Sequence, residues 1–130
     1  MIKPYDDWTY WDKSAEDVHG ISRQQLQQYG SDGITVCLEI NAFLSGADVF
    51  SDGWVVDSPW IIKLYEAAHM QMAFRISALE MILKEQQMRR WHVTKNAVIQ
   101  SLQLQRHRAS NDALIIQKTY EQTLTTATSV

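Results

Sequence analysis

Apolar residues recur with helical spacing in the second half of the chain. Between residues 61 and 83 they follow one another at steps of three and four, which places them on one face of an α-helix. The positions are Ile61, Tyr65, Ala68, Met72, Ile76, Leu79 and Leu83. All five glycines and both prolines precede Trp60, and these two residue types most often interrupt regular structure. The pattern predicts a largely helical tract from residue 58 onward.

The start of this tract and its reversals can also be predicted. Ser58 is a good N-cap and Pro59 suits the first position of a helix. One helix from there to residue 124 would be about 100 Å long, so we expect reversals at 92–96 and 109–112. The predicted helices are therefore about 59–91, 95–108 and 112–124, arranged as a long hairpin or a small bundle.

The N-terminal half is predicted to be irregular, with short helices. Ser22 can cap a helix over Arg23–Tyr29 that ends at Gly30. Residues 34–44 fit a strand by their β-branched start and a helix by their length. We favour a helix there, because the rest of the chain is helical and a single strand would have no partner.

The fold class predicted from these patterns is mainly α, in a single domain of 130 residues. A chain of this length can bury about two-thirds of its unfolded surface. The expected segments are an aromatic and acidic arm (1–13), short helices and loops (14–57), long helices (58–124) and a frayed tail (125–130).

Composition limits the class of protein and the compartment in which we expect it. The chain is 45% hydrophobic and 21% charged, which is ordinary for a globular protein. No apolar run approaches the roughly 18 residues of a membrane span, so we expect no membrane contact. Cys37 is the only cysteine, and its apolar neighbours predict a buried, inert thiol in a reducing compartment. We therefore expect a cytoplasmic, otherwise intracellular or virion, location.

Charge divides unevenly between the two halves. Residues 1–57 hold ten acids and three bases, whereas residues 58–130 hold nine bases and five acids. The net charges are −7 and +4, which together give the −3 of the whole chain. Opposite charges of this kind can attract within one chain or between chains.

Apolar side chains outside the main helical face point to a protein interface. A helix that is apolar most of the way round must be covered on more than one side, and tryptophans and tyrosines are favoured interface anchors. Part of the cover is expected from another chain, in a homo-oligomer or a hetero-complex. The predicted interface residues are Trp8, Tyr10, Trp11, Trp60, Leu64, Met70, Phe74 and Met81.

A basic segment supports a second interpretation, contact with nucleic acid. Residues 84–108 carry six bases against one acid, with Trp91 among them. The bases are Lys84, Arg89, Arg90, Lys95, Arg106 and Arg108. Basic side chains along a helix can contact a phosphate backbone. The acidic chain as a whole and the lack of a known nucleic-acid motif count against it.

Two further interpretations remain. Glu66 and His69 have the Glu-x-x-His spacing of di-iron helical bundles, with Glu39 as a further ligand and a second pair supplied by a homodimer. An acidic inhibitor or immunity protein would instead use the Asp-rich first half against a basic target. Neither a catalytic motif nor a phosphate loop is visible, so no catalytic residue and no cofactor is predicted.

The sequence best fits a non-catalytic structural, assembly or adaptor subunit of a larger complex. A virus-particle component and a small helical subunit of a bacterial machine are examples of this class. The alternatives are the nucleic-acid-contacting subunit, the dimeric metal protein and the acidic inhibitor.

Overall fold

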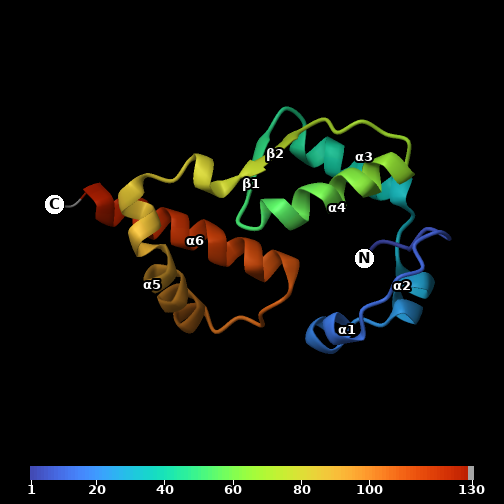
Figure 1. The fold of residues 1–130 in the computed structure, drawn as a ribbon, viewed down its shortest axis with the longest axis horizontal. Coiled ribbons are helices and arrows are strands. Elements are labelled where there is room, and N and C mark those ends of the chain that lie inside the picture. The colour runs from blue at the N-terminus through green and yellow to red at the C-terminus, as the bar shows by residue number, and fades with distance from the viewer. Residues whose placement is uncertain (129–130) are drawn as a thin grey trace. The chain divides into compact units, whose positions relative to one another are not determined.

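The predicted mainly helical fold is confirmed by a computed structural model, which describes residues 1–128 (Figure 1). The chain divides into two compact units, Met1–Leu79 and the part from Glu80 onward. In chain order the elements are α1 (Lys13–His19), α2 (Arg23–Tyr29), α3 (Gly33–Leu44), β1 (Asp48–Ser51), α4 (Trp54–Ala67), β2 (Arg75–Ala78), the 3-10 turn η1 (Leu79–Met81), α5 (Glu85–Leu102) and α6 (Ala109–Thr128).

The first two helices are short and are defined by their caps. Asp12 accepts a hydrogen bond from the backbone N–H of Ser14 at 2.9 Å and so begins α1, which ends at Gly20 with a left-handed φ of 72°. Ser22 and Gln25 form a reciprocal capping box at the start of α2. The predicted helix over Arg23–Tyr29 is confirmed, with its end at the predicted glycine.

Residues 34–44 belong to a helix, as we favoured. The Asp32 carboxylate accepts a hydrogen bond from the Thr35 N–H at 3.0 Å and thereby caps α3. Gly33 is the first residue of this helix, and the Tyr5 ring fills the space that a β-carbon at Gly33 would occupy. The N-terminal arm therefore packs directly onto the start of α3.

The core of the first unit lies between α3 and α4. Its buried members are Cys37 from α3 and Leu64, Tyr65 and Ala68 at the end of α4. Partly buried apolar residues from the arm and from the segment after α4 pack against it: Ile2, Tyr5, Trp8, Val36, Ile61, Met70, Met72 and Phe74. One small cluster thus joins the arm, both helices and the following segment.

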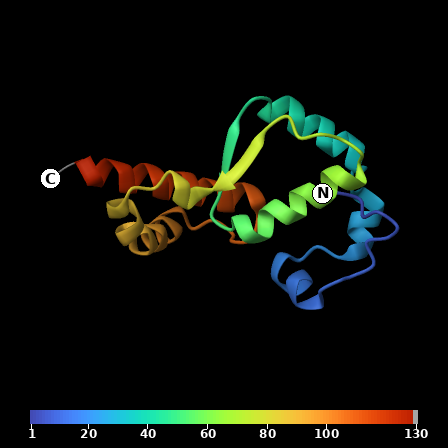
Figure 2. The same cartoon turned by 45° about the horizontal axis from the view of Figure 1, so that its top comes forward.

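A parallel strand pair completes the first unit. β1 pairs with β2 in a register that runs from Asp48 opposite Arg75 to Ser51 opposite Ala78. Parallel strands require a crossover connection, and α4 provides it and contacts both strands (Figure 2). This pair is the reason why Arg75–Ala78 are extended.

The predicted helix over 59–91 is replaced by α4, β2, η1 and the start of α5. The start signal at Ser58 and Pro59 was misleading, because α4 begins at Trp54 and contains both residues. Ser51 and Asp57 are bonded to each other across this start, where Gly53 is the N-cap residue. The Ser51 hydroxyl donates to the Asp57 carboxylate and accepts the N–H of Gly53 at 2.9 Å.

α4 ends far earlier than the apolar spacing predicted. His69 has a left-handed φ of 53°, and its N–H bonds the Glu66 carbonyl at 3.1 Å. The Met70 N–H bonds the Tyr65 carbonyl at 3.0 Å. These two bonds form a Schellman motif, which closes a helix without requiring glycine. Helix propensity is a weak preference, and the motif together with the pairing of β2 with β1 overrides it here.

The second unit is built from α5 and α6, which pack against each other (Figure 1). The predicted reversal at 92–96 lies inside α5, and the one at 109–112 lies in the first turn of α6. The chain turns at 103–108 instead, where Gln103 and His107 have positive φ. The predicted helices 95–108 and 112–124 therefore start too late. The tail predicted to fray is helical as far as Thr128, and 129–130 lie outside the described residues.

The contact between α5 and α6 contains a buried polar side chain. Gln87 is 1% exposed, and its Oε1 accepts the Lys84 N–H at 3.0 Å. Its Nε2 donates to Thr123 Oγ1 at 3.3 Å. The buried Thr119 hydroxyl donates to the Ile115 carbonyl at 2.7 Å. The polar groups of this helix contact are therefore satisfied, as burial requires.

Asn41 joins α3 to the end of α4 and to the segment beyond it. Its Oδ1 accepts hydrogen bonds from the Tyr65 hydroxyl and the Ala73 N–H, both at 2.9 Å. Its Nδ2 donates to the Gln71 carbonyl at 2.9 Å. One amide thus holds the chain as it leaves α4 toward β2.

We expect Asn41→Ala to lower the free energy of unfolding by about 2 kcal/mol, because three hydrogen bonds are lost around a partly buried group. Urea denaturation followed by tryptophan fluorescence measures this. Asn41→Asp, measured at a pH low enough to keep its carboxyl protonated, is the matched control, since the neutral acid keeps the acceptor for Tyr65 and Ala73 and can still donate to Gln71. Equal losses in both variants would contradict the role assigned to Oδ1.

We expect Gln87→Glu to be pH-dependent in its effect. Burial raises the pKa of a carboxyl group, so the variant should lose about 3 kcal/mol of unfolding free energy at pH 7. The loss should disappear as the pH falls below the pKa of glutamate in the unfolded chain, because neutral Glu has the shape of Gln. Thermal unfolding between pH 4 and 7 tests this. Gln87→Met is the control, with a loss that should not change with pH.

Candidate functional site

The exposed part of α4 carries four large apolar side chains beside the charged residues Lys63 and Glu66. Val55 is 80% exposed and Trp60 65% exposed, and Val56 and Ile62 are also exposed. We call these four residues the α4 outer face. The same helix also carries the buried Leu64 and Tyr65. α4 thus has apolar residues both in the core of its unit and on its exposed surface.

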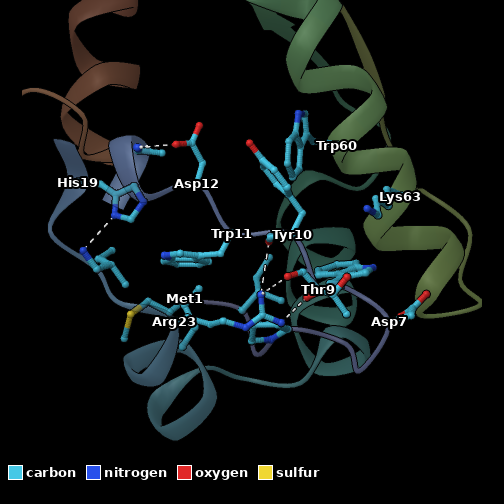
Figure 3. A pocket seen from close by; sticks show the side chains of 16 residues that line it. Met1, Asp7, Thr9, Tyr10, Trp11, Asp12, His19, Arg23, Trp60 and Lys63 are labelled. Carbon is cyan, nitrogen blue, oxygen red and sulfur yellow. Dashed lines mark hydrogen bonds between the residues drawn. The ribbon is translucent and has the colours of Figure 1, made fainter. Parts of the chain in front are cut away.

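An aromatic cavity lies next to this helix, within the first unit. Its volume is about 780 Å³, and its walls come from the N-terminal arm, α1, α2 and α4. Trp8, Tyr10 and Trp11 from the arm and Trp60 from α4 all line it (Figure 3). Three tryptophans and one tyrosine, from the arm and from α4, are therefore gathered around one space.

Arg23 holds the arm in position. Its guanidinium donates to the backbone carbonyls of Trp8, Thr9 and Tyr10, with Nη1 at 3.3 Å from the Thr9 oxygen and 3.4 Å from the Tyr10 oxygen (Figure 3). Because one planar cation binds three consecutive carbonyls, the backbone of residues 8–10 is held in one conformation. The position of that backbone in turn sets where the side-chain rings of Trp8 and Tyr10 lie.

Other polar groups in the wall are engaged within the protein. The Trp11 indole N–H donates to Glu16 Oε2 at 3.1 Å, and this bond is the main cause of a lowered Glu16 pKa. His19 Nδ1 accepts the Ile21 N–H at 3.0 Å. Asp12 caps α1, and its hydrogen bond from the Ser14 hydroxyl is the main cause of its lowered pKa. The atoms that make these bonds are used within the protein and are not available to a ligand.

Trp8 forms the link between the cavity and the core. Its ring packs on Tyr5 at a centroid distance of 5.0 Å. Lys63 Nζ lies 5.5 Å from the Trp8 ring centroid, a cation–π contact. Lys63 projects from α4 on the same stretch as Trp60 (Figure 3).

The other predicted interface residues lie elsewhere. Leu64 is 4% exposed and belongs to the core, and Met70 and Phe74 pack against that core. Met81 is exposed but lies in the second unit. The apolar spacing that selected them assumed one continuous helix, which the structure does not contain.

The six predicted nucleic-acid contacts are dispersed. Arg89 pairs with Glu85 at 2.6 Å and Arg106 pairs with Asp112 at 3.6 Å. α5 ends at Leu102, so Arg106 lies in the following loop and not on that helix. Lys84 precedes the first turn of α5, Arg90 is exposed on it, and Lys95 and Arg108 are partly buried.

The predicted metal pair does not share a helix. Glu66 is in the last turn of α4, whereas His69 follows its C-cap. Within residues 1–128, no three His, Cys, Asp or Glu side chains are grouped so that they can hold a metal ion. Glu39 is exposed on α3. Cys37 is fully buried, and burial raises the pKa of its thiol.

Comparison with known proteins identifies no relative, so the proposed function is based on the surface of the protein itself. No family model, curated protein or solved structure matches the chain. None of the described helices is both long enough and apolar enough to cross a membrane.

Sequence reasoning missed the residues that shape the cavity. Arg23 was placed in a short helix, but its bonds to the arm span about 15 residues of sequence and carry no local signal. In the sequence, nothing distinguishes Lys63 from other cations on a helix, because its contact with the Trp8 ring forms only in the folded protein. Only the arm aromatics and Trp60 were recognisable in advance.

We expect Arg23→Met to loosen the arm while leaving α2 folded, because methionine keeps the aliphatic stem and removes the guanidinium. Amide hydrogen exchange at Trp8 and Thr9 should accelerate about tenfold or more. Arg89→Met, which removes only an exposed ion pair in the second unit, is the control. Unchanged exchange in the arm would show that packing alone holds it.

Proposed function

We propose that this chain is a non-catalytic assembly or adaptor subunit that binds other protein chains through its first unit. The observation that carries the proposal is the α4 outer face, a set of exposed apolar side chains on a helix that also contributes to the core. Several large apolar side chains exposed on one helix favour an interaction site over a purely solvated surface.

The energy available from covering this face is substantial. Full burial of one large apolar side chain stabilises a complex by about 1.5–3 kcal/mol before the costs of association. Val55, Val56 and Ile62 are aliphatic, and Trp60 belongs to the residue type most enriched among interface anchors. A partner that covers all four gains enough to offset a large part of those costs.

α3 exposes apolar residues as well. Ile34 and Leu38 are one helical turn apart and both exposed, and Phe43 near the end of the helix is 87% exposed. These side chains are not needed for the core between α3 and α4. They support a subunit with more than one contact, such as a component of a virus particle or of a bacterial machine.

The alternative functions have less support. In the basic segment, two of the six cations are paired with acids in the same unit. In the acidic half, Asp12 and Asp32 cap helices and Asp57 bonds Ser51. These local roles account for part of each charge cluster without a nucleic acid or a basic target.

The test is the solution mass of the chain by light scattering over a wide concentration range. We expect concentration-dependent self-association, weakened when Val55→Glu and Ile62→Glu place two charges on the α4 outer face. Deletion of the arm is a poor test, because Ile2, Tyr5 and Trp8 pack against the core.

The matched control places the same two charges on a polar helix surface, with Gln24→Glu and Gln28→Glu on α2. This control should assemble as the unmodified chain does, and circular dichroism should show equal helix content in all three. A chain that stays monomeric throughout, with all variants alike, contradicts the proposal.

A further inference from the structure

We propose that the aromatic cavity binds an extended, proline-containing segment of a partner protein. This inference rests on the proposed function and deepens it, because it names the chemical class of a partner segment that the subunit would bind. The cavity is distinct from the α4 outer face, although Trp60 belongs to both.

The size and walls of the cavity suit a short peptide. About 780 Å³ lies within the range of about 300–1,000 Å³ typical of ligand sites. The rings of Trp8, Tyr10, Trp11 and Trp60 provide flat apolar surfaces. Such surfaces accept the faces of proline rings, as in the aromatic grooves that bind proline-rich peptides.

The polar groups left for a ligand are mainly donors. Among the described residues, neither the indole N–H groups of Trp8 and Trp60 nor the Tyr10 hydroxyl has a hydrogen-bond partner, and Lys63 makes no ion pair. The one carboxylate in the wall besides the capping Asp12 is Asp7. A ligand that presents acceptors and few donors matches this set.

A polyproline II segment has that character. Its backbone makes no internal hydrogen bonds, so its carbonyls are free to accept. Proline has no N–H that would be buried without a partner. The ring-lined wall and the donors around it therefore fit the same ligand.

Other occupants fit less well. A helical peptide uses most of its carbonyls internally, which leaves the donors of Trp60 and Tyr10 unmatched. A cationic group would find Asp7 and Asp12 in the wall, but the ammonium of Lys63 already lies over the Trp8 ring, 5.5 Å from its centroid. A second cation at that ring would be repelled by Lys63.

The experiment follows the indole N–H signals of the five tryptophans by NMR during titration with a decaproline peptide. We expect saturable shifts for Trp8 and Trp60, whose N–H groups are unengaged. The signal of Trp54, whose N–H bonds the Ile76 carbonyl, and that of the buried Trp91 in the second unit should stay in place. These two signals also report that the fold is intact.

Variants separate ring contact from hydrogen bonding. Trp60→Phe keeps a ring and removes the N–H, and should weaken binding about threefold to tenfold. Tyr10→Ala removes a ring and a donor, and should weaken it more. Tyr29→Ala is the matched control, because Tyr29 is an exposed tyrosine that does not line the cavity.

Three results would overturn the inference: no saturable shift at Trp8 and Trp60, equal or tighter binding of an alanine-rich helical peptide of the same length, or shifts caused by protein concentration alone. The last result would place a second copy in the cavity. Failure here leaves the light-scattering test untouched. Peptide binding by a chain that never assembles would uphold the cavity and reject the assembly role.

Discussion

The hydrogen bonds that join α3 to the end of α4 fix much of the arrangement of the first unit. The Asn41 amide bonds the Tyr65 hydroxyl at the end of the helix and the backbone at Gln71 and Ala73 beyond it. Because that backbone is fixed, the chain can return to pair β2 with β1. The segment after α4 is therefore held by one side chain of α3, together with the backbone bonds from Gly46 N–H to the Ala73 carbonyl and from Arg75 N–H to the Ala47 carbonyl.

Both candidate surfaces follow from this placement of α4. Part of the helix packs against Cys37, and the α4 outer face is left exposed. Trp60 and Lys63 are then presented beside the arm, which Arg23 fixes by its backbone carbonyls. The aromatic cavity is formed by the arm, α1, α2 and α4, and some of its polar wall groups, such as Arg23 and the Trp11 N–H, are satisfied internally. What it offers a ligand is chiefly ring surface and donors.

The sequence analysis succeeded where the signal was local. Ser22 and Gly30 bound a helix because a cap and a C-terminal glycine act within a few residues. It failed over 59–91, where the apolar spacing of three and four was satisfied by Tyr65 in a helix, Ile76 in a strand and Leu79 in a 3-10 turn. Burial alone selected apolar residues at these positions, and burial does not specify the secondary structure around them.

By itself, then, the sequence determined that the protein is mainly helical, that α2 is a helix, and that aromatic residues near the arm and Trp60 are candidates for contact; for 34–44 it favoured a helix without excluding a strand. Tertiary structure decided that the long tract breaks at His69, that Arg75–Ala78 are a strand, and that Trp8, Tyr10, Trp11 and Trp60 line one space. The physical reason is the separation in sequence between the residues that interact. Caps and turns act between neighbours in the chain, whereas the bonds of Asn41, the cation of Arg23 and the strand register join residues that are distant in sequence and near only after folding.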